Sequence, residues 1–95
     1  MTFEIINDFY ALNLYYYEID LTQNLNFQHL ILSFSSDKIN VYYSYNTTYP
    51  TKYMKDGECL NLYKCDINNN NGTNNTKLYI TLEPTEKLIY FKAKI

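Results

Sequence analysis

The stretch Tyr15-Tyr16-Tyr17-Glu18-Ile19-Asp20-Leu21 decides the fold class of this chain. Successive side chains of a β-strand point to opposite faces of the sheet, so a strand here places its odd-numbered residues on one face and its even-numbered residues on the other. The odd face is wholly aliphatic or aromatic, whereas the even face holds one tyrosine and two carboxylates. The stretch therefore predicts a half-buried strand with its odd-numbered side chains in a core.

The same two-residue alternation recurs along the chain, and the period of a helix is nowhere sustained. We expect strands at 13–21, 28–35, 39–45, 77–82 and 88–95, with short ones near 60–63 and 3–6. The side chains expected to face the core after the first strand are Leu30, Leu32, Phe34, Ile39, Val41, Tyr43, Tyr45, Leu78, Ile80, Leu82, Ile89, Phe91, Ala93 and Ile95. About seven strands in 95 residues predict an all-β protein, a single jelly-roll-like antiparallel β-sandwich that occupies residues 1–95 as one domain.

Polar segments separate the expected strands. Residues 35–38 and 83–86 have compositions typical of turns, and 46–50 ends in a proline, which a central strand does not accommodate. Residues 66–76 are dominated by asparagine around Gly72 and cannot bury enough apolar surface to order themselves. We expect an exposed loop there.

Charge and hydropathy exclude two classes of partner. Ten acidic residues against eight lysines give a formal net charge of -2, with no basic run that would neutralise a track of phosphates, so we expect no nucleic-acid partner. No stretch approaches the roughly 20 apolar residues that span a bilayer, and the first residues lack a secretory signal pattern. We expect no membrane insertion, and a soluble domain with neighbouring domains in a larger polypeptide.

Cys59 and Cys65 are the only two cysteines, and five residues lie between them. Such a pair in a small extracellular domain commonly closes a disulfide, and the alternative is a pair of buried thiols. A metal site is not supported, because the only histidine is His29 and no second cysteine pair stands at zinc-site spacing. We therefore predict a disulfide in an oxidising compartment, and neither a metal nor another cofactor.

Three triplets fit the N-glycosylation rule, and they begin at Asn46, Asn71 and Asn74. All three lie in segments that we expect to be exposed loops. A chain rich in asparagine and threonine also produces such matches by chance. Together with the cysteine pair, the triplets favour a secreted or cell-surface protein.

The chain offers few groups for catalysis, and we expect no enzyme. A hydrolytic triad would need His29 as its base, but this residue falls on an outward strand position, and no nucleophile turn lies near it. Glu18 and Asp20 share an outer face, where solvated charges are a commoner explanation than acid and base chemistry. With only Gly57 and Gly72, the chain has no glycine-rich phosphate loop.

The remaining candidate site is a set of tyrosines on the outward parity of the strands. The predicted ligand-binding residues are Tyr16, Tyr42, Tyr79 and Tyr90, joined by Tyr49 and Tyr53 from a loop. Flat, amphipathic rings stack on sugars or on apolar protein surfaces and lose little side-chain entropy. The alternative is a purely structural role, because tyrosine is a favoured strand residue and exposed cross-strand pairs stabilise a sheet.

The order of strand and turn types along the chain carries a family resemblance. Its segments are Tyr16-Tyr17-Glu18-Ile19-Asp20-Leu21, Leu30-Ile31-Leu32-Ser33-Phe34, Ile39-Asn40-Val41-Tyr42-Tyr43, Tyr49-Pro50-Thr51, Tyr63-Lys64-Cys65-Asp66, Asn71-Gly72-Thr73, Leu78-Tyr79-Ile80 and Ile89-Tyr90-Phe91. Over roughly residues 15–95 this order resembles the bacterial pre-peptidase C-terminal domains and their collagen-binding relatives. The resemblance implies a jelly-roll sandwich that serves a secreted enzyme or surface protein as an accessory module.

The resemblance does not extend to calcium. Some members bind calcium through an acidic start, whose only counterpart here is Glu4, Asn7 and Asp8, and the family's aspartate at the start of the third strand is replaced by Asn40. No calcium site is therefore carried over to this chain.

Two functions fit these observations. The first is a non-catalytic module that attaches a secreted enzyme or assembly to a polysaccharide or fibrous protein through its outer tyrosines. The second is a structural or adhesive domain of a surface or scaffold protein, which binds another extracellular protein. A coplanar row of exposed rings favours the first, whereas a contiguous apolar patch that includes Ile31 or Leu88 favours the second.

Overall fold

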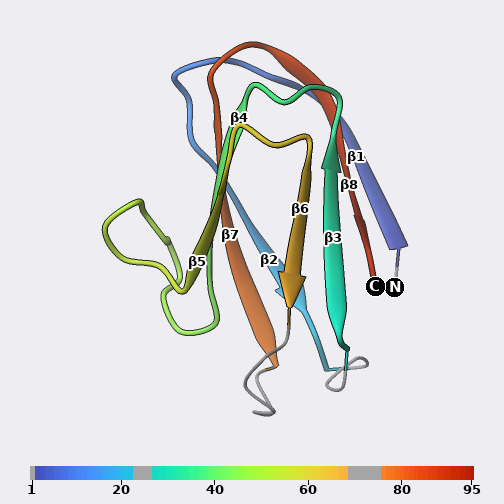
Figure 1. The fold of residues 1–95 in the computed structure, drawn as a ribbon, viewed down its shortest axis with the longest axis vertical. Coiled ribbons are helices and arrows are strands. Elements are labelled where there is room, and N and C mark those ends of the chain that lie inside the picture. The colour runs from blue at the N-terminus through green and yellow to red at the C-terminus, as the bar shows by residue number, and fades with distance from the viewer. Residues whose placement is uncertain (1, 23–26, 69–75) are drawn as a thin grey trace.

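Eight antiparallel strands form two four-stranded sheets in the computed structural model of the protein, which describes residues 2–22, 27–68 and 76–95 (Figure 1). The strands are β1 (Thr2–Phe9), β2 (Tyr15–Asp20), β3 (His29–Phe34), β4 (Ile39–Ser44), β5 (Gly57–Leu60), β6 (Lys64–Asn68), β7 (Lys77–Pro84) and β8 (Leu88–Lys94). The strand order is β1-β8-β3-β6 in the first sheet and β2-β7-β4-β5 in the second. The predicted all-β antiparallel sandwich is confirmed, with eight strands in place of about seven.

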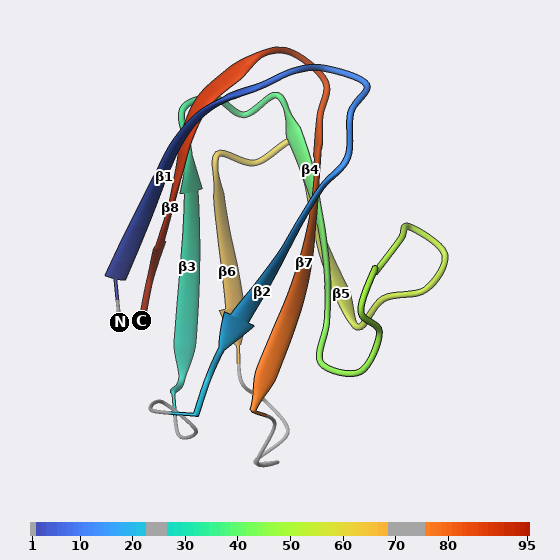
Figure 2. The same ribbon diagram turned by 180° about the vertical axis from the view of Figure 1, so that it is seen from behind.

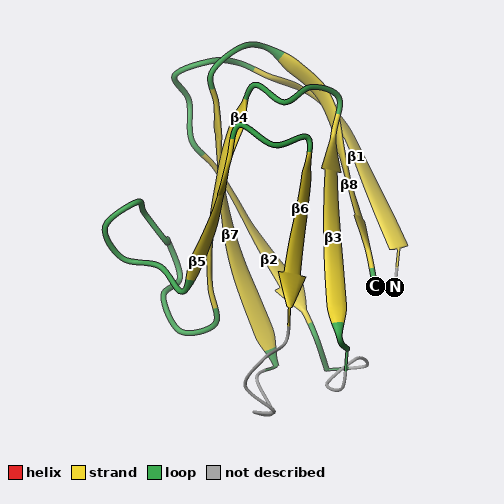
Figure 3. Cartoon of the chain, in the orientation of Figure 1, coloured by secondary structure: helices red, strands yellow, loops and turns green. Residues whose placement is uncertain are grey.

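The two sheets face each other, and the ends of the chain lie together. Seen from behind, β1 and β8 run side by side, and both termini lie at the same end of the first sheet (Figure 2). The part of the chain that the structure describes consists of strands and loops (Figure 3), so it contains no helix long and apolar enough to cross a membrane.

The strand alternation fills the space between the sheets with apolar side chains. Every inward residue predicted for β3 and β7 is buried. On β4, Ile39 and Val41 are buried and Tyr43 packs against the core, as does Tyr45 directly after the strand. Phe91 lies at the centre of an aromatic cluster. The centroids of four other rings lie 5.0 to 5.9 Å from its own, and they belong to Tyr17, Phe34, Phe3 and Phe9. Such edge-to-face and tilted contacts add to the gain from burial.

Two strands form where the sequence predicts one short strand near 60–63. Asn61 adopts a positive φ of 55°, in the left-handed region that asparagine tolerates, and ends β5 before the alternation is complete. Leu60 and Leu62 are consequently both exposed. The loop expected at 66–76 cannot begin at Asp66, because β6 continues to Asn68. Residues 69–75 lie outside the described part of the chain.

The inward assignment of Ile89 is wrong: this side chain is 57% exposed, whereas Leu88 is buried. The pairing of β1 with β8 changes register here, since Ile6 lies opposite Tyr90 while Phe9 lies opposite Leu88. Leu88 and Phe91 are both buried although they lie three positions apart, so the two-residue alternation of β8 is interrupted between them.

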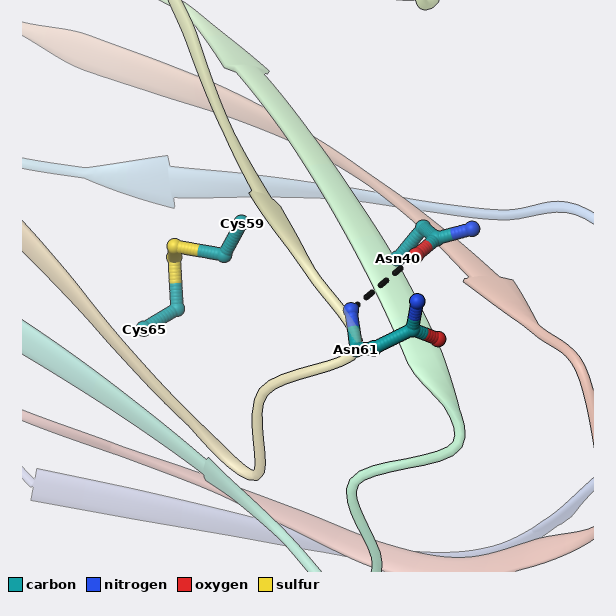
Figure 4. Close-up of a disulfide and its surroundings, with 4 residues drawn as sticks. All are labelled: Asn40, Cys59, Asn61 and Cys65. Carbon is teal, nitrogen blue, oxygen red and sulfur yellow. Dashed lines mark hydrogen bonds between the residues drawn. A yellow bond between two sulfur atoms is a disulfide. The ribbon is translucent and has the colours of Figure 1, made fainter.

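The predicted disulfide joins Cys59 to Cys65, with 5.7 Å between their Cα atoms (Figure 4). Cys59 lies on β5, an edge of the second sheet, and Cys65 lies on β6, an edge of the first. The bond therefore ties the two sheets together along one side of the sandwich, and the alternative of two thiols is wrong. Beside it, the Asn61 amide donates to Oδ1 of Asn40 at 3.1 Å and fixes the turn between β5 and β6.

Candidate functional site

The loop between β4 and β5, residues 45–56, stands out from the outer side of the second sheet (Figure 1). Its middle is fastened to the sheet, because the Thr81 hydroxyl on β7 donates to the Pro50 carbonyl at 2.7 Å. The Tyr49 ring packs edge-to-face on Tyr16 of β2, with 5.0 Å between centroids. Pro50 and Thr81 are both buried. The loop thus covers the centre of a sheet face that strand parity alone would expose.

A polar clasp fixes the two ends of this loop. The Asp56 carboxylate accepts hydrogen bonds from the Ser44 hydroxyl at 3.1 Å and from the Tyr45 amide at 2.8 Å. The Ser44 oxygen in turn accepts from the amides of Asn46 and Thr47 at 3.1 and 3.0 Å. The chain therefore leaves β4 and returns to β5 at one point, which holds the loop against the sheet.

The predicted tyrosine set does not form one surface. Tyr16 on β2 and Tyr42 on β4 lie on either side of Thr81 on β7. Tyr79 lies two residues before Thr81 on β7 and pairs with Glu18 on β2. Tyr90 faces outward from the first sheet, on the opposite side of the sandwich, where the Lys92 ammonium lies 5.1 Å from the centroid of its ring.

The exposure of these rings also differs from the expectation. Tyr16 is 47% exposed, but Tyr42 retains only 5% because the loop covers it. Tyr79 and Tyr90 are half-buried. Tyr49 and Tyr53 are exposed on the loop, as expected.

A groove runs between the loop and the outer face of the second sheet. Its inner part has a volume of about 240 Å³ and is lined by Leu14, Tyr42, Pro50, Thr51, Lys52, Tyr53, Thr81 and Glu83. A second hollow of about 420 Å³ shares Leu14 and Glu83 and adds Leu12, Pro84 and Thr85. We call the two together the outer-face groove. The larger hollow is in the size range of ligand pockets, and the exposed lining of both hollows is mainly apolar.

Glu83 is the one carboxylate in the outer-face groove. Its Oε1 accepts hydrogen bonds from the Tyr42 hydroxyl at 3.2 Å and from the Asn40 side-chain amide at 3.1 Å. Burial, followed by the charge of Glu83, raises the pKa of Tyr42. The phenol therefore keeps its proton and remains a donor to Glu83 at physiological pH, which orients the carboxylate.

A smaller hollow of about 150 Å³ lies beside the contact between Tyr16 and Tyr49. Its lining also includes Tyr17, Glu18, Thr48 and Tyr79. Glu18 is already paired with Lys77 at 2.8 Å, and this hydrogen bond raises the pKa of Lys77. The acid in this hollow is therefore neutralised, in contrast to the acid in the outer-face groove.

The residues considered for catalysis have local structural partners. His29 is exposed, with Nδ1 3.0 Å from a carboxylate oxygen of Asp66. Asp20 accepts hydrogen bonds from the side chain and amide of Thr22, which lower the pKa of Asp20. No group of three or more metal-ligating side chains occurs in the described ranges.

Of the three predicted glycosylation sites, the described residues include only Asn46. Asn46 is exposed at the start of the β4–β5 loop. Asn71 and Asn74 lie outside the described residues.

The amino-acid sequence alone does not predict most of the outer-face groove. Glu83 is assigned to a turn at 83–86, but β7 continues to Pro84 and carries Glu83 into the sheet. Pro50 signals a strand end without showing that its carbonyl bonds to Thr81. One available signal is Leu14, an apolar residue on the same parity as Tyr16.

Comparisons of the chain with protein-family models, curated proteins and solved structures give no match. The resemblance to pre-peptidase C-terminal domains is thus confirmed only as far as the two-sheet antiparallel sandwich, and the family itself stays a prediction.

Proposed function

We propose that the protein is a non-catalytic extracellular binding module and that the outer-face groove is its ligand site. The main support for this proposal is the groove that the β4–β5 loop leaves where it is fixed across the sheet. Its walls are exposed apolar and aromatic side chains, and they lie beside the oriented carboxylate of Glu83. Large exposed apolar side chains beside a preformed hollow are typical of ligand sites. The disulfide supports an oxidising compartment, such as the cell exterior.

The ligand that fits best is an extended protein segment, as found in fibrous proteins. The exposed rings do not form a coplanar row, because Tyr16 and Tyr49 meet at 77° and Tyr42 is covered. The groove offers Leu12, Leu14 and Tyr53 instead, which suit apolar side chains. Ile31 and Leu88 take no part in this surface, since neither lines the groove and Leu88 is buried.

Polysaccharide binding is the second candidate, and the small hollow beside Tyr16 favours it. Four tyrosines, a threonine and a glutamate line that hollow, and such a mixture of aromatic rings and polar groups is suited to binding sugars. An adhesive domain that binds a folded partner is the alternative in which the same groove serves a surface or scaffold protein.

The strand orders β1-β8-β3-β6 and β2-β7-β4-β5 support the jelly-roll connectivity, since the chain crosses between the sheets at each of the first three connections.

Binding is tested by capture of the purified domain on a panel of immobilised fibrous proteins and insoluble polysaccharides. Replacement of Tyr53 or Leu14 by alanine is expected to weaken capture about tenfold, because each removes a wall of the groove. The control is Tyr90→Ala, which truncates a ring on the opposite sheet and should leave capture unchanged.

Two results count against the groove as the site. Either capture is unaffected by both groove variants, or Tyr90→Ala weakens it as much as they do. Melting curves of the three variants verify that each remains folded, since Tyr53 and Leu14 are exposed and contribute little to the core.

A further inference from the structure

Glu83 has no lysine partner among the described residues, unlike Glu18 and Glu58 on the same sheet face. Glu18 pairs with Lys77 at 2.8 Å, and Glu58 pairs with Lys55 at 3.1 Å. No lysine among the described residues comes within ion-pair distance of Glu83. Lys52 lines the same groove, but its ammonium lies 5.0 Å from the centroid of the Tyr53 ring.

The carboxylate of Glu83 is held ready for a ligand. Both hydrogen bonds from Tyr42 and Asn40 end on Oε1, and no donor among the described residues reaches Oε2. A half-buried carboxylate between apolar walls loses part of its hydration, and a cationic donor compensates for that loss better than a neutral one. The charge of the groove floor is therefore complementary to a positive group.

The walls of the groove suit the rest of a basic side chain. A lysine or arginine carries a methylene stem that lies along apolar surface while its charged end reaches a polar partner. Leu14 and Glu83 line both hollows of the groove, so an apolar wall and the carboxylate stand next to each other at their junction. Neighbouring apolar side chains of an extended segment would contact Leu12 and Tyr53.

We propose that the outer-face groove recognises a lysine or arginine side chain of an extended polypeptide, with Glu83 as the residue that determines this specificity. The inference rests on the proposed function and refines it, because it names the chemistry of the ligand. An ammonium or guanidinium group binds Oε2 of Glu83, and the aliphatic stem lies on Leu14.

The test uses three capped pentapeptides, Gly-Leu-Xaa-Leu-Gly, in which Xaa is lysine, norleucine or glutamate. Norleucine keeps the aliphatic stem of lysine and lacks the ammonium. The lysine peptide is expected to bind the wild-type protein at least tenfold more tightly than the norleucine peptide, with shifts in the amide resonances of Thr51 and Thr81. The substitution Glu83→Gln is expected to abolish that ratio, since glutamine still accepts from Tyr42 but carries no charge.

The control is Glu58→Gln, which removes a paired acid from the same sheet face and should preserve the tenfold ratio. The inference is overturned if Glu83→Gln keeps the ratio, or if the norleucine or glutamate peptide binds the groove as tightly as the lysine peptide. Binding of norleucine in the groove would leave the proposed function standing while removing the role of Glu83. If no peptide shifts Thr51 or Thr81 and the ligands captured on the panel shift neither residue, both proposals fail together.

Discussion

Replacement of Phe91 by alanine is expected to lower the free energy of unfolding by about 3–5 kcal/mol, a large part of the stability of a domain of this size. Phe91 is fully buried on β8, and the rings of Tyr17 and Phe34 lie 5.0 and 5.8 Å from it, among four aromatic neighbours. The substitution removes those contacts and leaves a cavity between the two sheets. Urea unfolding followed by tyrosine fluorescence measures the loss.

The matched control is the adjacent ring, Tyr90, which faces outward from the same strand and is only half-buried. Tyr90→Ala is expected to cost about 1 kcal/mol or less, because it mainly loses contact with Lys92. Equal losses for the two variants would show that the inward and outward faces of β8 are assigned incorrectly.

Reduction of the disulfide is expected to destabilise the protein by about 2 kcal/mol, which lowers the melting temperature by roughly 10 °C. The bond closes a short loop with a sequence separation of 6 and connects edge strands of different sheets. It restricts the unfolded chain and also prevents β5 and β6 from separating. Calorimetric melting with and without dithiothreitol measures the effect.

The control for the disulfide is the double variant Cys59→Ala/Cys65→Ala, whose melting should be insensitive to dithiothreitol. Mass spectrometry of the oxidised protein should show a mass lower by two hydrogens than that of the reduced protein. Two titratable thiols in the native oxidised protein, or equal melting temperatures with and without reductant, would contradict the bond between the sheets.

Strand alternation is the part of this fold that the sequence predicts well. Leu30, Leu32 and Phe34 on β3 are buried as expected, because a two-residue period and a single core leave one arrangement that removes them from water. Such patterns do not predict a local change of register. The register shift near Leu88 depends on pairing between distant strands, and the left-handed turn at Asn61 depends on one backbone angle.

The candidate site is harder to predict from the sequence than the strands are, because contacts between distant parts of the chain create it. Parity correctly places Tyr16 and Tyr42 on one sheet face, but it does not predict that a loop folds over that face and covers Tyr42. The hydrogen bond from Thr81 to Pro50 joins residues 31 positions apart. The hydrogen bonds that orient Glu83 come from Asn40 and Tyr42 on β4, which lie 43 and 41 positions away in the sequence.

The most direct test of the outer-face groove as the ligand site is a map of amide chemical-shift changes in the isotope-labelled protein during titration with a soluble fragment of the captured ligand. The largest changes are expected at Leu14, Thr51, Tyr53 and Thr81, which line the groove on β7, the β4–β5 loop and the entry to β2. Changes centred on Ile31, Lys92 and Lys94, with the groove residues unmoved, would place binding on the opposite sheet and contradict the assignment.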